Sequence, residues 1–301
     1  MISVLLAAVL PWLQSPPALP PSHPPIGMSS YVPQRVFDTR RKAFSDFESM
    51  LADLARADAV FVGEQHDDMN THRLELAILE GLTRRGVPVV LAMEMFERDV
   101  QPVMERYASG ALSEEEFVKQ SRPWPRYATD YRPLIEFARA HKLPIVASNT
   151  PHRIASDVGK TGMSVIDALN STDRVFVARD STCPKSGSYY DRFIEAMGGH
   201  EGSNPNFYFA QCLKDETMGE AVANAFRSAS DRVTVVHING AFHSDFGEGT
   251  AESARRRMPG RRIAVVSMLP VDDLDTEKPD DDDLKRADYL VFTVAGPASP
   301  R

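Results

Sequence analysis

Six short apolar runs recur along the chain and alternate with segments of helical periodicity. We predict β-strands at residues 59–62, 87–93, 144–147, 233–238, 263–268 and 289–294. A run that is apolar throughout, rather than alternately apolar and polar, is typical of a strand buried on both faces. Strands of this kind separated by helices indicate a parallel sheet covered on both sides. The sequence therefore predicts an α/β fold with a mostly parallel sheet and helices on both faces.

Segments with apolar residues at helical spacing lie between these runs and before the first of them. They predict helices at residues 37–57, 70–85, 99–109, 113–120 and 131–141, and another that begins at Thr250. Ser113 and Glu116 match a capping box. Residues 150–229 contain helical patterns and no convincing strand, so we expect a helical cap inserted over the carboxyl edge of the sheet. Residues 272–283 predict a solvated acidic loop, because closely spaced carboxylates repel.

The size and composition of the chain are ordinary for a globular protein. Its 301 residues, 43% hydrophobic and 25% charged, suit one domain with a cap, which we place at residues 35–301. The net charge is -8. Binding to a phosphate backbone needs a basic face, so we expect no nucleic-acid partner.

Residues 1–34 differ in composition from the rest of the chain. Residues 2–13 are apolar apart from Ser3 and too few to span a bilayer, and a proline-rich tract follows before the first charged residue, Arg35. This pattern is typical of a signal-peptide core with a flexible stalk, and it predicts export to the periplasm or cell envelope. The alternative is a disordered apolar start on a cytoplasmic protein.

The chain has two cysteines, Cys183 and Cys212. No cysteine precedes Cys183, so the sequence offers no N-terminal cysteine for a lipid anchor, and any envelope association depends on the N-terminal segment. The two thiols either pair in an oxidising compartment or remain free and buried, since sequence alone does not give their distance.

Two Gly-x-x-His quartets, at residues 63–66 and 240–243, each come just after a predicted buried strand. In an open α/β sheet, ligands bind in the crevice outside the carboxyl ends of the strands. His66 and His243 should therefore meet at one edge of the sheet, although they are far apart in the sequence. The quartet alone is weak evidence, and the position after a strand carries the prediction.

Polar side chains follow the other core strands in the same way. We expect them to line one concave pocket, with His66 and His243 less than a third exposed; the set is Glu64, His66, Glu94, Asn149, Arg153, His237, Asn239 and His243. Two imidazoles with carboxylates suit a divalent metal such as zinc, held by His66, Glu94 and His243, with Glu64 as general base. The alternative is a set of hydrogen-bonded polar groups that cap strand ends.

Other side chains could complete such a pocket. His72 follows His66 by six residues and either faces the pocket or lies on a helix surface, and Gln211, Asp215 and Met218 could roof it from the cap. The aromatic residues Tyr127, Tyr131, Tyr189 and Tyr190 would suit a flat apolar ligand or act as packing anchors.

Taken together, five segments resemble the ChaN-like haem-binding family of the Tiki superfamily, over roughly residues 40–268. They are VGEQHDD at 62–68 with His72, MEMF at 93–96, ASNTPHR at 147–153, AQ at 210–211 with DETM at 215–218, and HINGAFH at 237–243. The resemblance implies an α/β fold with a helical cap and a role in haem or iron uptake. It also implies haem held at a homodimer interface, with a tyrosine on the iron.

The resemblance leaves two functions open. For haem, the predicted cofactor-binding residues are Tyr127, Tyr131, Tyr189, Tyr190, Arg153, His237 and Asn239. Other members of the superfamily, the Tiki proteases and the erythromycin-esterase-like enzymes, use paired Gly-x-x-His motifs and acidic residues for hydrolysis. The matching positions here are His66 and His243 with Glu64 and Glu94, so the alternative is a metal-dependent protease or esterase.

Overall fold

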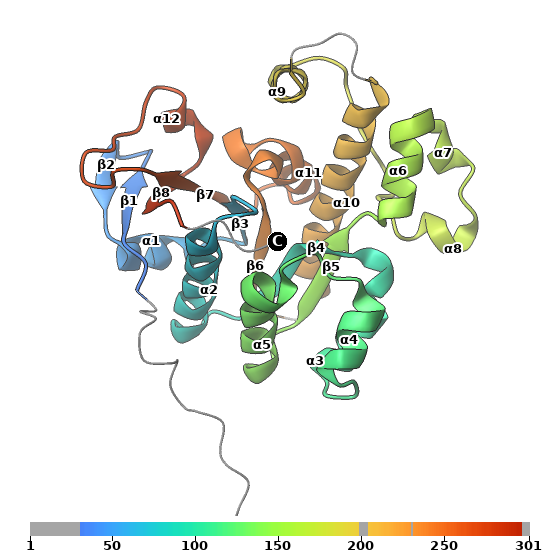
Figure 1. The fold of residues 1–301 in the computed structure, drawn as a ribbon, viewed down its shortest axis with the longest axis horizontal. Coiled ribbons are helices and arrows are strands. Elements are labelled where there is room, and N and C mark those ends of the chain that lie inside the picture. The colour runs from blue at the N-terminus through green and yellow to red at the C-terminus, as the bar shows by residue number, and fades with distance from the viewer. Residues whose placement is uncertain (1–30, 199–203, 230, 297–301) are drawn as a thin grey trace, which may run out of the picture. The chain divides into compact units, whose positions relative to one another are not determined.

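The computed structural model describes residues 31–198, 204–229 and 231–296 (Figure 1). The chain divides into two units, Met1–Tyr31 and Val32–Arg301, and the fold described here is that of the second. Apart from residues 31–34, the predicted signal-like segment and stalk lie outside the described residues. Within those residues, no helix has the length and apolar character needed to cross a membrane.

One sheet contains the eight strands found among the described residues. They are β1 (Gln34–Asp38), β2 (Ala43–Ser45), β3 (Ala59–Glu64), β4 (Val89–Glu97), β5 (Ile145–Asn149), β6 (Thr234–Gly240), β7 (Ile263–Val271) and β8 (Tyr289–Val294). Their order is β2-β1-β8-β7-β3-β6-β4-β5. The six strands from β8 to β5 are parallel, and β1 runs antiparallel to both of its neighbours. The predicted α/β fold with a mostly parallel sheet is confirmed.

The helix predicted at residues 37–57 is wrong in its first half. Phe37 lies in β1 and is the register partner of Phe44 in β2, with the two ring centroids 5.1 Å apart. Of the apolar residues whose spacing suggests this helix, Phe44 thus belongs to a cross-strand pair, whereas Phe47, Leu51 and Leu54 do lie on a helix. Helix α1 (Phe47–Leu54) begins only after Asp46, whose carboxylate accepts the Ser49 N–H at 2.7 Å.

Helices cover both faces of the sheet. The α-helices after α1 are α2 (Met69–Arg84), α3 (Gln101–Ala108), α4 (Glu114–Ser121), α5 (Arg132–Ala140), α6 (His152–Thr161), α7 (Ser164–Asp167), α8 (Ser171–Arg174), α9 (Ser188–Ala196), α10 (Asn206–Ser228), α11 (Gly249–Arg257) and α12 (Asp283–Arg286). Figure 1 shows α2 and α5 on one side of the sheet and α10 and α11 on the other. Successive strand residues face opposite layers: Val60 and Val62 pack with α1, α2 and α5, whereas Ala59 and Phe61 pack with α10 and α11.

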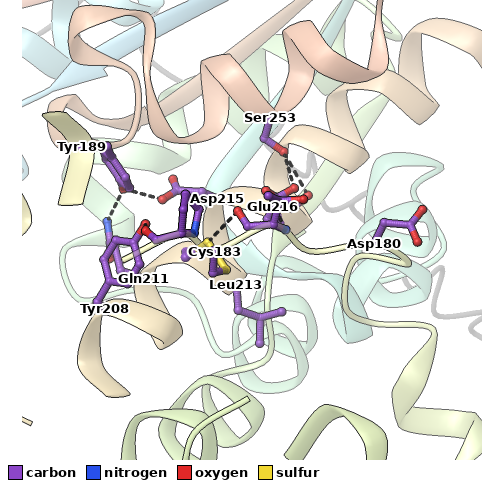
Figure 2. The surroundings of a disulfide bond; sticks show 12 residues. Asp180, Cys183, Tyr189, Tyr208, Gln211, Leu213, Asp215, Glu216 and Ser253 are labelled. Carbon is purple, nitrogen blue, oxygen red and sulfur yellow. Dashed lines mark hydrogen bonds between the residues drawn. A yellow bond between two sulfur atoms is a disulfide. The ribbon is translucent and has the colours of Figure 1, made fainter. Parts of the chain in front are cut away.

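The described part of the segment between β5 and β6 contains helices and loops and no strand, as expected for the cap. It contains α6 to α10. A disulfide joins Cys183, just before α9, to Cys212 in α10, which decides between the two states left open for these thiols (Figure 2). The bond ties the segment that leads into α9 to the long helix that runs back to the sheet.

Two local predictions are also confirmed. Ser113 and Glu116 form the capping box at the start of α4, where each side chain bonds the other residue's backbone N–H. Residues 272–282 form a loop that leads into α12, which begins at Asp283, and none of residues 272–283 is buried. These local features follow from the chemistry of neighbouring residues, so they need no knowledge of the tertiary fold.

Candidate functional site

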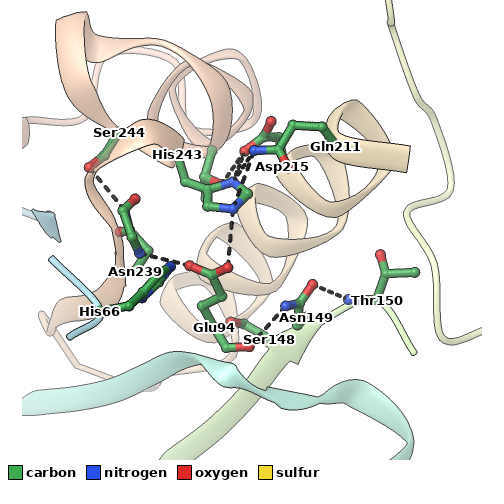
Figure 3. A network of polar contacts seen from close by, with 12 residues as sticks. His66, Glu94, Ser148, Asn149, Thr150, Gln211, Asp215, Asn239, His243 and Ser244 are labelled. Atoms are coloured by element: carbon green, nitrogen blue, oxygen red, sulfur yellow. Dashed lines mark hydrogen bonds and ion pairs between the residues drawn. The ribbon is translucent and has the colours of Figure 1, made fainter. Parts of the chain in front are cut away.

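The two Gly-x-x-His motifs lie side by side at the carboxyl edge of the sheet. Strands β3 and β6 are parallel neighbours, and Glu64 is paired in register with Gly240. His66 follows β3 by two residues, and His243 ends the 3-10 turn Ala241–His243 that follows β6. Glu94 comes from β4, on the other side of β6. The sheet thus brings His66, Glu94 and His243 together, as their positions after strands predict (Figure 3).

The glycine of each motif makes room for the other motif. A Cβ on Gly240 would lie 2.6 Å from Nε2 of His66, and a Cβ on Gly63 would lie 2.9 Å from the Cα of Ala241. Both distances are well inside normal contact separations. The two glycines are therefore required by close approach between the motifs.

The parity of the strands divides the site into two clusters. Glu64 follows Val60 and Val62 on the face covered by α2 and α5. Glu94 follows Val90 and Ala92 on the face covered by α10 and α11. We call the first the Glu64 cluster (Glu64, His66, His72, Glu75, Tyr131) and the second the Glu94 cluster (Glu94, Asp215, His243, Tyr189, Thr250).

In the Glu94 cluster, His243 bridges two carboxylates. Its Nδ1 lies 2.6 Å from Oδ1 of Asp215 and its Nε2 lies 3.1 Å from Oε1 of Glu94 (Figure 3). Burial lowers the pKa of His243, but the two carboxylates outweigh it and raise this pKa to about 10. Burial likewise raises the pKa of Glu94, and the imidazolium outweighs it and brings this pKa to about 2. His243 is therefore a buried cation that donates a hydrogen bond through each nitrogen.

The cap holds Asp215 in place. The Tyr189 hydroxyl of α9 donates to Oδ2 of Asp215 (Figure 2), and from outside the cap the Thr250 hydroxyl of α11 donates to Oδ1 at 2.8 Å. Gln211, one turn before Asp215 on α10, places its amide nitrogen 3.3 Å from Nδ1 of His243. Asp215 and Gln211 thus reach the site from the cap, as the sequence pattern allows.

In the Glu64 cluster, one carboxylate has partners on several sides. Oε1 of Glu64 lies 2.6 Å from Nδ1 of His66 and accepts the Tyr131 hydroxyl at 2.9 Å. Oε2 lies 3.3 Å from Nδ1 of His72. Burial raises the pKa of Glu64, but the two histidines outweigh it, so the pKa of this carboxyl is well below its usual range.

The predicted exposure is right for His243 and wrong for His66. The His243 side chain is 7% exposed, but that of His66 is 46% exposed. His66 lies beyond the end of β3, so its ring is not covered by neighbouring strands, and its nearest aromatic contact is Trp124 with ring centroids 5.2 Å apart. The pKa of His66 is raised: burial lowers it, and Glu64 followed by Glu94 outweighs this.

A cavity of about 770 Å³ opens over both clusters. Glu64, His66, Glu94 and His243 lie at its base. The cap contributes Phe193 and Met197 to its wall, which supports the expected roof. Its remaining aromatic and cationic lining includes Trp124, Phe242, Phe246, Arg192, Lys214 and Arg286.

The prediction that eight residues line one pocket is wrong for Asn149, Arg153, His237 and Asn239. In the described part of the chain, none of these four lines the cavity. His237 lies inside β6 and is wholly buried; its Nδ1 is 2.9 Å from Oδ1 of Asn239 and its Nε2 is 3.0 Å from Ser148. Burial lowers the pKa of His237 to about 4, so this imidazole is neutral.

Hydrogen bonds also account for the other three residues. Asn149 donates to the carbonyl of Glu94 at 3.0 Å, and Asn239 donates to Oγ of Ser244 at 3.0 Å. These amides support the strand ends beneath the cavity, as in the alternative of polar groups that cap strand ends. Arg153 lies on α6 and forms a two-pronged ion pair with Asp173 at 2.6 and 2.9 Å, half-exposed on the cap.

The four tyrosines predicted to bind a cofactor also lie outside the cavity lining in the described residues. Tyr127 and Tyr131 are buried, and the hydroxyls of Tyr131 and Tyr189 are hydrogen-bonded to Glu64 and Asp215. Tyr190 is half-buried, with its ring edge-on to Tyr208 at 4.8 Å, and no residue described in the structure bonds its hydroxyl. Tyr190 therefore has the most available phenol of the four.

The three predicted metal ligands do not form a compact set. Among the residues described, His66, Glu94 and His243 do not bring one ligand atom each within 4.8 Å of one another, whereas Glu64, His72 and Glu75 do. The three predicted ligands are spread out because His66 belongs to the Glu64 cluster, whereas Glu94 and His243 belong to the Glu94 cluster on the other face of the sheet. Sequence reasoning missed Glu75, although His72 and Glu75 are three residues apart on α2 and so share one face of the helix.

Comparison with known proteins identifies a relative at low sequence identity. It is the Arabidopsis thaliana protein RETICULATA-RELATED 5, chloroplastic, 24% identical over 273 residues, with 82% of this chain and 35% of that protein covered. The chain thus spans about a third of the length of that relative.

Solved structures show a shared fold. The structure described as cofacial heme binding to ChaN of Campylobacter jejuni superposes with a TM-score of 0.62 at 15% identity, covering 86% of this chain and 96% of that one. Erythromycin esterase EreC in its open conformation reaches a TM-score of 0.46 at 10% identity, covering 89% and 84%, a likeness too weak to carry an argument. Residues 50–253 match the family described as haem-binding uptake, Tiki superfamily, ChaN. Because this match covers more than half of the chain, the protein belongs to the ChaN family of the Tiki superfamily.

Proposed function

We propose that this protein binds haem and takes part in haem or iron uptake at the cell envelope. Family membership over residues 50–253 is the observation that carries the proposal. The cavity adds physical support, because Phe193, Met197 and Phe242 offer apolar contacts to a flat macrocycle. Lys214 and Arg286 on its wall are cations suited to the propionate carboxylates.

Within this proposal, Tyr190 is the axial ligand of the iron. Its phenol is the one predicted tyrosine that is both partly accessible and without a hydrogen bond to the described residues. On α9 it precedes Phe193 by three residues and Met197 by seven, so the three side chains share one face of the helix, and the latter two line the cavity. Tyrosinate is an established axial ligand of haem iron.

Titration of the purified full-length chain with haem tests both statements. We expect saturable binding with a shifted Soret band, and a tyrosinate signature that Tyr190→Phe removes. Tyr127→Phe is the matched control, because the Tyr127 phenol is buried. Absence of saturable binding would refute haem binding. A wild-type spectrum in the Tyr190→Phe variant would refute the assignment of the ligand and point to the half-exposed imidazole of His66.

The geometry of the two clusters favours hydrolysis as a second candidate function. His66 is the accessible imidazole, and Glu64 contacts its Nδ1, so Nε2 is the nitrogen available as a general base. Glu64, predicted as the base, would then orient His66 as the third group of a triad does. The His243 cation is already paired with Glu94 and Asp215, so Lys214 on the cavity wall is the cation that would stabilise developing negative charge.

A panel of ester, lactone and peptide substrates tests this second function. We expect turnover that falls at least about 100-fold in a His66→Gln variant, the scale of a lost general base. His141→Gln is a control, since His141 lies on the surface at the end of α5. Equal turnover in both variants would exclude His66 as the base.

A further inference from the structure

The buried side of the Glu64 cluster has the composition of a metal site. Glu64 and Glu75 are 1% and 0% exposed, and His72, between them, is 4% exposed. Nδ1 of His72 lies 3.3 Å from Oε2 of Glu64 and 3.3 Å from Oε2 of Glu75. Two buried carboxylates thus converge on a single imidazole nitrogen beneath the cavity.

The hydrogen bonds around this trio leave ligand atoms unused. Oε2 of Glu64 and Oε1 of Glu75 are buried and have no hydrogen-bond partner among the described residues. A buried carboxylate oxygen without a donor is costly, so a proton or a cation is expected between the two side chains. A proton shared by the carboxylates satisfies one pair of oxygens, whereas a divalent cation satisfies both carboxylates and the imidazole together.

The outer contacts match those of metal ligands. Nε2 of His72 lies 3.3 Å from the carbonyl oxygen of His66 and 3.5 Å from Oδ2 of Asp130, so an N–H on Nε2 has acceptors there. Metal-bound histidines are usually oriented by such a bond. A cation between the carboxylates would then displace the proton of Nδ1 and bind this nitrogen. On Glu64, the Tyr131 hydroxyl and His66 contact only Oε1, which leaves Oε2 for a cation.

The distances fit a small tetrahedral ion. Zinc binds histidine nitrogen and carboxylate oxygen at about 2.0–2.1 Å, so two ligand atoms of a tetrahedral site lie about 3.3 Å apart. The two nitrogen-to-oxygen distances are both 3.3 Å. Two of the three distances between ligand atoms therefore already match such a site, and all three atoms lie within 4.8 Å of one another.

We propose that Glu64, His72 and Glu75 form a buried site for one divalent transition-metal ion of the zinc class. The ion lies on the α2 side of the sheet edge, distinct from the His243 bridge in the Glu94 cluster. It replaces the proton between the two carboxylates and anchors Glu64, which in turn orients His66 at the cavity. The site is independent of haem, so it stands or falls separately from the proposed function.

Equilibrium dialysis of the metal-stripped full-length chain against Zn²⁺, with elemental analysis, tests the site. We expect one Zn²⁺ per chain in the wild type, and at least about a 100-fold weaker affinity in Glu75→Gln, since losing a ligand costs more than the 10- to 100-fold of an outer-shell change. Glu94→Gln is the matched control, because it removes a buried carboxylate of the other cluster, and it should bind Zn²⁺ as the wild type does.

Cobalt(II) loading gives a second readout. A tetrahedral site should show an intense visible absorption band that Glu75→Gln abolishes, while circular dichroism confirms that the variant is folded. Failure of the wild type to bind Zn²⁺ or Co²⁺ at a one-to-one ratio would overturn the proposal and leave a shared proton as the explanation. Loss of Zn²⁺ in Glu94→Gln to the same extent as in Glu75→Gln would also overturn it, because the ion would then lie in the cavity.

Discussion

Replacing Gly240 with alanine tests whether the fit between the two motifs sets the position of His66. The added Cβ would lie 2.6 Å from Nε2 and 2.7 Å from Cε1 of His66. Carbon atoms in comfortable contact are about 3.5–4.0 Å apart, so the imidazole must move by about 1 Å. The ring is half-exposed and can swing towards solvent, so the fold tolerates the substitution while the site does not.

The size of the effect follows from the contact between His66 and Glu64. A shift of about 1 Å would stretch the 2.6 Å distance to Glu64 beyond hydrogen-bonding range. A hydrogen bond to a charged group contributes about 1.5–3 kcal/mol, and exposure of the ring reduces this to about 1 kcal/mol of stability. The pKa of His66 should fall, because Glu64 and Glu94 outweigh the opposing effect of burial only at short range.

Gly63→Ala is the control with the opposite pattern. Its Cβ would lie 2.9 Å from the backbone Cα of Ala241, which cannot swing away. We expect about 1–3 kcal/mol of lost stability, typical of overpacking. Urea unfolding and an NMR titration of His66 measure both quantities. An unchanged pKa of His66 in Gly240→Ala would refute the reasoning, because it would mean that the ring does not depend on the space left by Gly240.

Three further perturbations test the disulfide and the buried histidines. Replacing Cys183 and Cys212 with alanine should lower the free energy of unfolding by about 3–4 kcal/mol, given their separation of 29 residues, and urea titration with and without reductant measures it. The pKa of His243 is raised to about 10, so the protonated ring stabilises the folded state fully below pH 6.5, and this stabilisation is lost as the pH rises towards 10. Asp215→Asn should lower that pKa and reduce the loss of folding free energy between pH 6 and 10, as measured by NMR titration and by unfolding. The pKa of His237 is lowered to about 4, so between pH 6.5 and 4 this imidazole is protonated in the unfolded chain but not in the folded one. The free energy of unfolding should therefore fall by about 3 kcal/mol over that range. A His237→Gln variant with the same pH dependence as the wild type would contradict this.

The sheet could be predicted from the sequence because its six parallel strands are continuously apolar. The antiparallel hairpin of β1 and β2 could not, because Phe37 and Phe44 are spaced as on a helix and only their pairing across strands reveals the hairpin. The disulfide likewise depends on the distance between α10 and the segment before α9, which no local pattern gives. Tertiary contacts decided both cases.

The sequence predicted that these strand ends meet, but not which polar side chains there reach the cavity: Glu94 lies within β4 and reaches it, whereas Arg153 comes after β5 and does not. His66 and His243 follow β3 and β6 and reach the cavity, whereas His237 and Asn239 lie inside β6 and are buried in the sheet. Other partners at the site come from helices, which the strand pattern does not reveal. Glu75 is one such partner, and it falls among the apolar residues of α2, where a carboxylate has no evident local reason to be.

Strand parity accounts for the division of the site into two clusters. Because successive side chains of a strand face opposite sides, Glu64 in β3 and Glu94 in β4 enter different helix layers although both lie near the carboxyl edge of the sheet. Each carboxylate then shares a buried histidine with a second acidic residue, His72 with Glu75 and His243 with Asp215. Of these three site histidines, His66 alone is substantially exposed, and its ring lies between the clusters, bonded to Glu64 and packed against Gly240. Chemistry at the cavity should therefore depend on His66, while the two buried pairs set its position and the charge around it.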